Sequence, residues 1–377
     1  MRILAVIHEF PPIGGGAGMV FADLAGELVK LGHEIDVVTA AHGNLPERED
    51  SGGVGIHRIR CGRRRQIAPS VPELLGYVRE APSHALRMMR ARQYDLIYGT
   101  CILPGGLVAR KLHQATGLPY MLTTSGSDVP GHNPRKFGLA HRLTRPLWRR
   151  VIRDAAAVTC QSEYLAGRIR AAYGGPVPNL HIIPNGIDTE SIRPRPLEER
   201  EKRILAVGRI EEAKGYQYLI EAMAGLDTDY RLEIVGDGPY LPALRSLAER
   251  LGVPVVFHGW IDKSNGALRN LYETSSIFVH PSLAEAFGVV VLEAMLAGLP
   301  IVVAEGSGSA ELVGEVGLKV PPANVGALHN ALARLLRDPR LRTDLGEAAR
   351  QSTEHLYAWR RVATRYQDMM VRTIGKA

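Results

Sequence analysis

Short apolar runs alternate with longer segments of helical periodicity along the whole chain. In the first half the apolar runs are Ile3–Ile7, Glu34–Thr39, Asp95–Tyr98, Tyr120–Thr123, Ala157–Cys160 and His181–Ile183. In the second half they are Ile204–Val207, Leu232–Val235, Val255–Phe257, Ile277–His280, Ile301–Ala304 and Leu318–Val320. Strands that alternate with helices form parallel sheets covered by helices on both faces. The pattern therefore predicts an α/β protein made of two similar doubly wound halves.

A change of composition separates the two series of strands. The segment Asp188–Pro196 and the charged run Leu197–Arg203 have the composition of a linker. We therefore expect one domain over residues 1–188, a second over 189–354, and a C-terminal helix over 355–377.

The longest nearly apolar stretch, Ala286–Ala304, contains Glu293, Gly298 and Pro300 and is predicted to form a helix, a turn and a strand. The apolar start, Ile3–Ile7, is too short for a signal peptide. These features predict a cytoplasmic protein. Its three cysteines, Cys61, Cys101 and Cys160, are widely spaced and are expected to be buried and unpaired.

Positive charge is concentrated in the first half of the chain. Residues 1–195 carry 25 Lys and Arg against 16 Asp and Glu, and the remaining residues carry 21 against 23. The clusters are Arg58, Arg60, Arg63, Arg64, Arg65, then Arg87, Arg90, Arg92, then Arg142, Arg145, Arg149, Arg150, Arg153. Such a surface favours anionic lipid or a phosphate-bearing acceptor over nucleic acid, and an arginine-rich solvated surface without a partner is equally consistent with it.

The last cluster lies on the predicted helix Leu139–Ile152, whose apolar stripe has a cationic flank. Such a helix lies on a membrane surface, at the inner face of the membrane for a cytoplasmic protein, or packs on a core with its arginines toward water. Pro146 is expected to kink it or to begin a new helix.

Two carboxylates, Glu285 and Glu293, enclose an apolar segment around Gly288. Glu285 is predicted in the loop before a helix and Glu293 on that helix, whose free N–H groups suit anionic or hydroxyl-rich ligands. The alternative is an exposed loop glutamate and a solvated helix face. The spacing resembles that of retaining glycosyltransferase family 4, in which two glutamates flank seven residues, and this similarity extends nearly from end to end of the chain.

The resemblance implies the GT-B fold, in which two Rossmann-like domains face a central cleft. It implies that the C-terminal helix, which includes Trp359–Ala363, completes the first domain; packing on its own domain is the alternative. Glu285 would contact the transferred sugar and Glu293 the ribose hydroxyls. The residues Phe287, Gly288 and Val289 would present the helix N-terminus to the donor diphosphate.

Arg209 and Lys214 stand five positions apart in a loop bounded by Gly208 and Gly215. Both can reach one diphosphate, with Arg as a planar fork and Lys as a point charge. In the resembled family they oppose the charge on the leaving nucleoside diphosphate without a tightly bound metal; two exposed loop cations are the alternative.

The first half also has loops with glycine after its strands. Gly15 and Gly16 follow the first strand in a loop that does not match a P-loop. Its backbone can approach phosphate or sugar oxygens, and the resemblance implies that it faces the donor phosphates and the acceptor; tight packing of strand on helix is the alternative. In Thr123–Val129 the family often has a histidine before the glycine, where this chain has Ser125, so Gly126 and Asp128 are the expected site residues. Asp128 in an Asx turn is an equally good interpretation. The resemblance implies that Trp260 and Ile261 lie near the base and that Asp237 has a largely structural turn role. For His258 a turn role is at least as good an interpretation as a contact with the ligand.

We therefore expect a retaining hexosyltransferase that uses a UDP- or GDP-sugar, with no tightly bound cofactor and no metal. The expected acceptor is a lipid-linked or phosphorylated glycan precursor of bacterial surface polysaccharide or glycolipid. A nucleotide-sugar 2-epimerase of the same fold and a non-catalytic nucleotide-sugar or membrane-surface binding module are the alternatives.

Overall fold

The computed structural model describes residues 1–66, 69–132, 134–262 and 266–375. It divides into two compact units, one formed by Met1–Gly186 with α13 (Trp359–Ile374) and the other by Ile187–Ala358. The first division therefore lies two residues before the expected one. The C-terminal helix begins at Trp359 instead of residue 355, because α12 (Pro339–Leu356) continues to Leu356.

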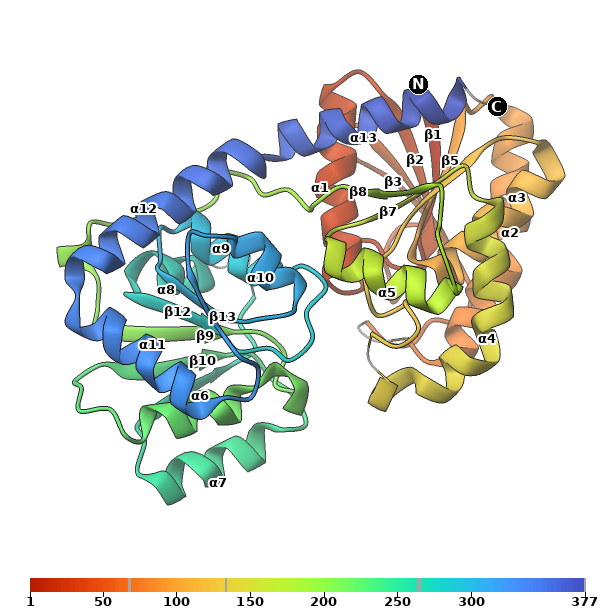
Figure 1. The fold of residues 1–377 in the computed structure, drawn as a ribbon. Helices are drawn as coiled ribbons and strands as arrows, with labels where there is room; N and C mark the ends of the chain where they lie inside the picture. Colours follow the sequence, from red (N-terminus) through yellow and green to blue (C-terminus); the bar gives the residue numbers. More distant parts are fainter. Residues whose placement is uncertain (67–68, 133, 263–265, 376–377) are drawn as a thin grey trace. The chain divides into compact units, whose positions relative to one another are not determined.

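The first unit contains an eight-stranded sheet with the order β3-β4-β2-β1-β5-β6-β7-β8 (Figure 1). All neighbouring strands are parallel except β3 and β4, which are antiparallel. Its strands are β1 (Arg2–Val6), β2 (Glu34–Ala40), β3 (Arg48–Ser51), β4 (Val54–Ile59), β5 (Leu96–Thr100), β6 (Tyr120–Thr123), β7 (Ala157–Cys160) and β8 (Leu180–Ile182). Its helices besides α13 are α1 (Gly16–Lys30), α2 (Val71–Ala91), η1 (Cys101–Gly105), α3 (Gly106–Thr116), α4 (Pro134–Asp154) and α5 (Glu163–Tyr173).

The hairpin β3–β4 is absent from the sequence prediction. All four residues of β3 are exposed, so this antiparallel edge strand carries no apolar signal. β4 pairs in parallel with β2 and alternates Val54 and Ile56 with small or polar residues; of this strand, only Arg58 entered the sequence prediction, as part of a basic cluster.

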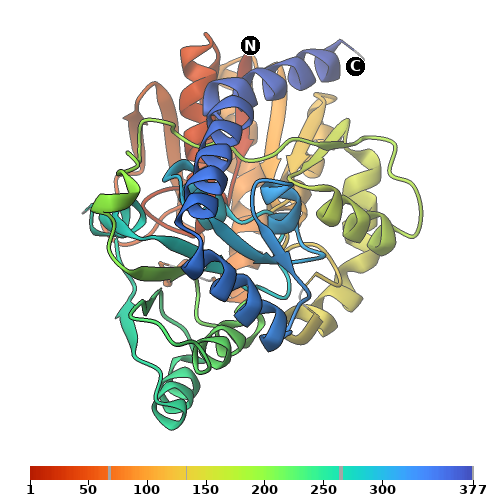
Figure 2. The ribbon, with the colours of Figure 1, turned by 60° about the vertical axis from the view of Figure 1, so that its left-hand side comes forward.

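α13 packs on the first unit, where it lies along α1 (Figure 1 and Figure 2). Trp359, Val362, Tyr366 and Met370 join the core beneath β1 and α1. A Cβ atom at Gly186 would lie 2.4 Å from the Trp359 ring, so only glycine allows this contact.

The second unit contains a six-stranded parallel sheet with the order β11-β10-β9-β12-β13-β14. Its strands are β9 (Arg203–Val207), β10 (Arg231–Val235), β11 (Val255–Gly259), β12 (Ile277–His280), β13 (Ile301–Ala304) and β14 (Leu318–Val320). Its helices besides α12 are η2 (Leu197–Glu199), η3 (Glu212–Lys214), α6 (Tyr216–Met223), α7 (Leu241–Leu251), α8 (Ala267–Thr274), α9 (Val289–Leu296), α10 (Gly308–Val313) and α11 (Val325–Arg337).

The nearly apolar stretch Ala286–Ala304 forms α9, a turn and β13, as predicted. Gly298 adopts φ +65° in that turn. Among the described residues, no helix has the length and apolar content needed to cross a membrane.

One expectation about the arginines and one about Pro146 are corrected. Arg58 and Arg63 are buried and donate to backbone carbonyl groups, so the first cluster is only partly a surface. Pro146 begins no new helix, because α4 runs through it. Arg145 and Arg149 on α4 both donate to the carbonyl of Ala172 and thereby hold α4 against the end of α5.

Candidate active site

The side chains of Lys214 and Glu285 form an ion pair at the C-terminal edge of the second sheet. The Nζ of Lys214 lies 2.6 Å from Oε2 of Glu285, and the two side chains are 22% and 18% exposed. Lys214 ends η3, and Glu285 lies in the loop before α9, as the sequence predicted. The loop that carries Lys214 packs on the loop that carries Glu285 at Gly215, where a Cβ atom would lie 2.1 Å from the carbonyl oxygen of Pro281.

His280, the last residue of β12, completes this cluster. Its Nε2 lies 3.0 Å from the same Glu285 oxygen, and its side chain is 1% exposed. Burial opposes ionisation of Glu285, but Lys214 and His280 outweigh burial, so the pKa of Glu285 lies below its usual value. Burial also lowers the pKa of His280. Glu285 is therefore a carboxylate and His280 a neutral ring at neutral pH.

Arg209 lies on the loop after β9, and its half-exposed side chain contacts Glu211 at 3.3 Å. Gly208, Gly236 and Gly238 bring the loops after β9 and β10 together, since Cβ atoms at Gly236 and Gly238 would lie 2.0 Å from the Gly208 oxygen and 2.2 Å from the Ile210 oxygen. The main chain of Asp237 accepts from Ile210, and its side chain from Gly238, which is the turn role expected for it.

The N-terminus of α9 lies directly after Glu285. Gly288 caps it with φ +95°, Phe287 is buried, and Val289 is partly exposed. A Cβ atom at Gly308 would lie 2.1 Å from the oxygen of Ala286, so α10 packs tightly on this loop. The amide N–H groups of Val289 and Val290 belong to the first turn, whose donors have no partner within the helix.

Glu293 lies on the same helix and accepts a hydrogen bond from the hydroxyl of Tyr272, at 2.8 Å. Tyr272 is buried on α8, and burial raises the pKa of its hydroxyl well above the usual value. The bond fixes one carboxylate oxygen of Glu293.

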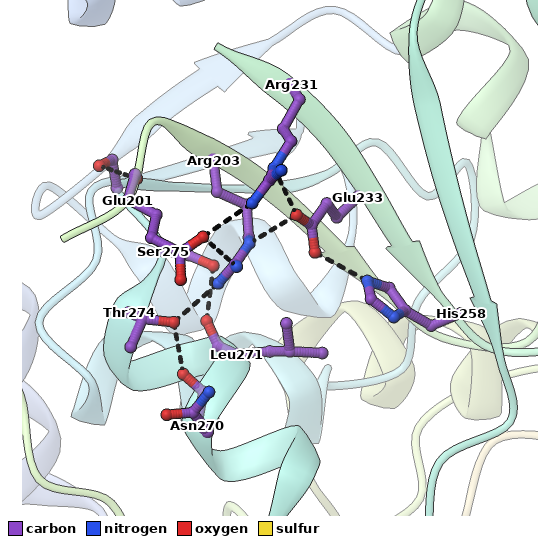
Figure 3. A network of polar contacts seen from close by, with 10 residues as sticks. Glu201, Arg203, Arg231, Glu233, His258, Asn270, Leu271, Thr274 and Ser275 are labelled. Atoms are coloured by element: carbon purple, nitrogen blue, oxygen red, sulfur yellow. Dashed lines mark hydrogen bonds and ion pairs between the residues drawn. The ribbon is translucent and has the colours of Figure 1, made fainter.

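The neighbouring edge of the sheet carries Trp260 and Ile261 and a structural ion network. Trp260 is 67% exposed, and Ile261 is half-buried. His258 lies within β11 and contacts Glu233 at 2.7 Å, which replaces the turn role expected for it. Glu233 also pairs with Arg203 at 2.8 Å and Arg231 at 2.9 Å (Figure 3). The network satisfies a buried carboxylate, so we assign it to stability.

In the first unit, Gly15 and Gly16 begin α1, and a Cβ atom at either would contact nothing within 4 Å. The loop is held by Gly14, which has φ +98° and donates to the carbonyl of Gln66. Open space at a helix N-terminus is compatible with a phosphate or sugar.

Asp128 is buried and holds a strained loop. Its Oδ2 accepts from the N–H of Ile102 at 2.6 Å, and its Oδ1 from the N–H of Ser125 at 3.0 Å. Gly126 adopts φ +94°, and Cys101 has φ +61° although it is not glycine. This is the geometry of a turn-holding residue, and contact of Asp128 with a substrate stays a prediction.

The loops of the first unit also bring together three groups that we did not predict. His8 is buried after β1, and its Nδ1 has no partner among the described residues. Burial, followed by the charge of Arg63, lowers the pKa of His8 to about 4. Arg63 lies 3.7 Å from Glu9 and donates to the carbonyl of His8.

The structure thus brings Lys214 to Glu285, whereas Arg209 contacts Glu211. His280 could have been found from its place at the end of a strand. Tyr272 carried no signal in the sequence. Within the described ranges, no group of three or more His, Cys, Asp or Glu residues could hold a metal ion, and the three cysteines are buried and free.

Comparison with known proteins matches each of the two units to a glycosyltransferase family. The family description "Glycosyl transferase 4-like domain" matches residues 15–186, and "Glycosyl transferases group 1" matches residues 188–352. The sulfoquinovosyl transferase of Arabidopsis thaliana is 30% identical over 97% of this chain and 73% of its own length. This chain belongs to the group 1 glycosyltransferases.

The glycosyltransferase is also 28% identical to a mannosyltransferase of Mycolicibacterium smegmatis, over 98% of each chain. That relative is named as GDP-mannose-dependent and as acting on phosphatidylinositol monomannoside. Sucrose-phosphate synthase from Thermosynechococcus elongatus superposes with a TM-score of 0.86 at 23% identity, covering 100% of each chain. HepE of Anabaena, solved with UDP-glucose, has a TM-score of 0.77 at 20% identity, covering 100% of each chain. The fold is therefore GT-B, and the protein is a transferase; an epimerase is not favoured.

Proposed function

We propose that this glycosyltransferase moves a hexose from a nucleoside-diphosphate sugar to a phosphate-bearing, lipid-linked acceptor, with retention of anomeric configuration. The observation that supports the proposal is the ion pair between Lys214 and Glu285, since an ammonium group suits a diphosphate and the carboxylate beside it suits sugar hydroxyls. The names of the relatives, which include a GDP-mannose-dependent enzyme, support the class of donor.

Lys214 is proposed to bind the diphosphate without releasing Glu285. An ammonium group has three N–H donors, and the described contacts give one of them to Glu285. Arg209 is more exposed and meets Glu211 only at 3.3 Å, so its guanidinium can turn to the same phosphates. Together with the N–H groups of Val289 and Val290, these cations oppose the charge that develops on the leaving group.

Glu285 is proposed to accept hydrogen bonds from the hexose hydroxyls. Its low pKa keeps it an acceptor at neutral pH, and Lys214 and His280 fix its position. The acceptor hydroxyl then attacks the anomeric carbon from the side on which the diphosphate leaves. The bond from carbon to acceptor oxygen forms as the bond to the phosphate oxygen breaks, and a phosphate oxygen takes the hydroxyl proton. This route requires no second carboxylate as a base.

The donor nucleotide is proposed to bind along the same edge of the second sheet. Glu293, with one oxygen fixed by Tyr272, would accept from the ribose hydroxyls. The exposed ring of Trp260 and the side chain of Ile261 offer an apolar surface for the base.

The acceptor phosphate is proposed to bind the loop 62–66 of the first unit. Glu73 accepts from the N–H groups of Arg64 at 2.6 Å and Arg65 at 3.0 Å, which fixes the main chain and leaves both guanidinium groups exposed. The Gln66 carbonyl accepts from Gly14, so these arginines lie on a loop tied to the glycine loop. A relative from Pseudarthrobacter chlorophenolicus, 26% identical, is named for D-inositol 3-phosphate.

The lipid part of the acceptor is proposed to bring the protein to the membrane surface through α4. Leu139 is 73% exposed and Leu143 72%, and exposed Arg142 and Arg150 lie on the same helix. Apolar residues flanked by arginines suit a surface of anionic lipid.

Turnover with UDP-, GDP- and ADP-hexoses and an extract of lipid-linked acceptors tests the proposal. We expect one nucleotide to be preferred and the product to keep the anomeric configuration of the donor, as read from NMR coupling constants. Lys214→Ala should lose at least 100-fold in turnover, whereas Lys319→Ala, which removes an exposed Lys–Glu pair of the same unit, should not. Inversion, or activity in Lys214→Ala equal to that of the parent, contradicts the proposal.

The acceptor loop is tested separately. Arg64→Ala with Arg65→Ala should raise the KM for a phosphorylated acceptor at least tenfold and leave donor affinity unchanged. Arg60→Ala with Arg87→Ala removes the same charge from other positions of the unit and should change neither. An equal effect of the two double variants would show that only overall charge matters.

A further inference from the structure

The second unit contains a pocket of about 260 Å³ that none of the proposed donor-site residues lines. The segment 194–200, the turn Gly298–Pro300 after α9, and α12 form its walls. Its lining carries four arginines, Arg195, Arg200, Arg342 and Arg350, and one carboxylate, Glu347. This excess of positive charge has no role in the transfer reaction proposed above.

Arg200 is held in this pocket by carbonyl groups alone. It donates to the carbonyls of Ala297 at 3.0 Å, Gly298 at 3.1 Å and Arg195 at 2.8 Å. Burial lowers the pKa of Arg200 to about 10, with no opposing contribution from a carboxylate. Because this pKa is still well above neutral pH, the guanidinium of Arg200 stays charged although much of it is removed from water.

Arg342 is similar. It is 7% exposed, donates through Nη1 to the carbonyls of Leu335 and Leu336, and faces the ring of Tyr230. Its buried Nε has no hydrogen-bond partner among the described residues. Within the described residues, the charge of Arg342 is therefore met only by two carbonyl groups and an aromatic ring.

The carbonyl partners do not neutralise these two charges. Arg200 binds the C-terminal end of α9 and Arg342 that of α11, and each helix end carries only about half a negative charge. Arg350 is balanced by Glu354 at 2.8 Å, whereas Arg195 is exposed at the rim. The pocket therefore keeps a net positive potential.

We propose that this pocket binds a small phosphate ester, with the phosphate among the arginines and the carbon part against Pro194, Pro196 and Pro300. Phosphate oxygens match the planar donor set of guanidinium groups. At about 30 Å³ per water, the volume corresponds to roughly nine water molecules, which is close to the size of glycerol 3-phosphate. A ligand there joins the linker segment to α12 and α9, and the helix α9 carries Glu293.

Calorimetric titration with glycerol 3-phosphate tests this site, with glycerol as the uncharged control. The titration is run in an Arg64→Ala, Arg65→Ala background with saturating uridine or guanosine diphosphate. Phosphate binding at the loop 62–66 and at Arg209 and Lys214 then does not contribute. We expect one site that binds glycerol 3-phosphate and not glycerol. Arg195→Ala with Arg350→Ala should weaken this binding at least tenfold, because it removes two guanidinium groups from the lining. Both residues lie at the solvent side of the pocket, so the fold should tolerate their loss.

Arg337→Ala with Arg340→Ala is the matched control, since both are exposed and remove the same charge from α11 and α12. Three results would overturn the proposal: no binding to the parent, equal binding of glycerol, or equal weakening by the two double variants. Thermal unfolding of each variant checks that the second unit is folded.

Discussion

Lys214 and Glu285 are separated by 71 residues in the sequence, and their side chains meet at 2.6 Å. The contact joins the loop after β9 to the loop before α9, because β9 and β12 are adjacent parallel strands whose C-terminal ends lie at one edge of the sheet. The pairing sets the cation that we propose for the phosphate beside the carboxylate that we propose for the sugar. Ligand binding at strand C-termini is general for open α/β sheets.

Replacing the carboxylate of this pair should separate binding from turnover. In Glu285→Gln, Lys214 loses its anionic partner and is freer to bind phosphate. We expect nucleoside diphosphate to bind as tightly as to the parent or more tightly, and turnover to fall by about 100-fold or more. Calorimetry and initial rates measure the two effects. Glu315→Gln removes an exposed carboxylate of the same unit and should change neither.

Gly215 should be sensitive for a steric reason beyond its backbone angle. Gly215 has φ +73° and Gly252 has φ +65°, but only at Gly215 would a Cβ atom meet a backbone oxygen. Gly252→Ala should cost about 1 kcal/mol of stability from the left-handed backbone alone. Gly215→Ala should cost more and should also weaken donor binding, because Lys214 is displaced. Equal losses of stability and affinity in the two variants would refute the steric explanation.

Asp128→Asn distinguishes a positioning role from a catalytic one. An amide nitrogen would replace an oxygen that accepts a backbone N–H, so we expect a loss of about 2 kcal/mol in the first unit. Of the three tryptophans, Trp148 and Trp359 lie in this unit, so urea unfolding followed by fluorescence in a Trp260→Phe background reports on it. Asp95→Asn is the control, because Asp95 also accepts a backbone N–H but is exposed. Lost turnover with unchanged stability would instead show a catalytic role.

His8 should make the first unit sensitive to acid. Its pKa is about 4 in the folded protein against 6.5 for the free side chain, so the unfolded chain binds more protons between these values. The stability that comes from keeping His8 neutral is therefore complete above pH 6.5 and is lost as the pH falls toward 4. The loss is about 3 kcal/mol. Unfolding in urea at a series of pH values should show a shallower decline for His8→Gln than for the parent. An identical decline would exclude His8 as the cause.

The exposed leucines of α4 should govern association with lipid. Leu139→Ser with Leu143→Ser should reduce co-sedimentation with vesicles of anionic phospholipid at least tenfold, since both apolar contacts are lost. Leu356→Ser changes an exposed leucine of the second unit and serves as the control. Sedimentation that is equal for the variant and the control, or absent for the parent, would rule out this contact.

The alternation of strands and helices, the division into two units and the place of Glu285 before α9 could all be predicted from the sequence. Each follows from local patterns, namely the period of the apolar residues and the turn residues, whereas the roles expected of Glu285 and Glu293 came from the family resemblance. The hairpin β3–β4 could not be predicted, because an exposed edge strand such as Arg48–Ser51 has no apolar face.

The sequence by itself thus determined the architecture and proposed the loops and several of the residues that make up the site. Only the tertiary structure decided that Lys214 pairs with Glu285, that His280 completes the cluster, and that Arg58 and Arg63 are buried. The physical reason is that apolar periodicity reports which face of an element is buried, and says nothing of which polar side chain from another element meets it. That choice depends on strand order and on close backbone contacts such as those at Gly215 and Gly308.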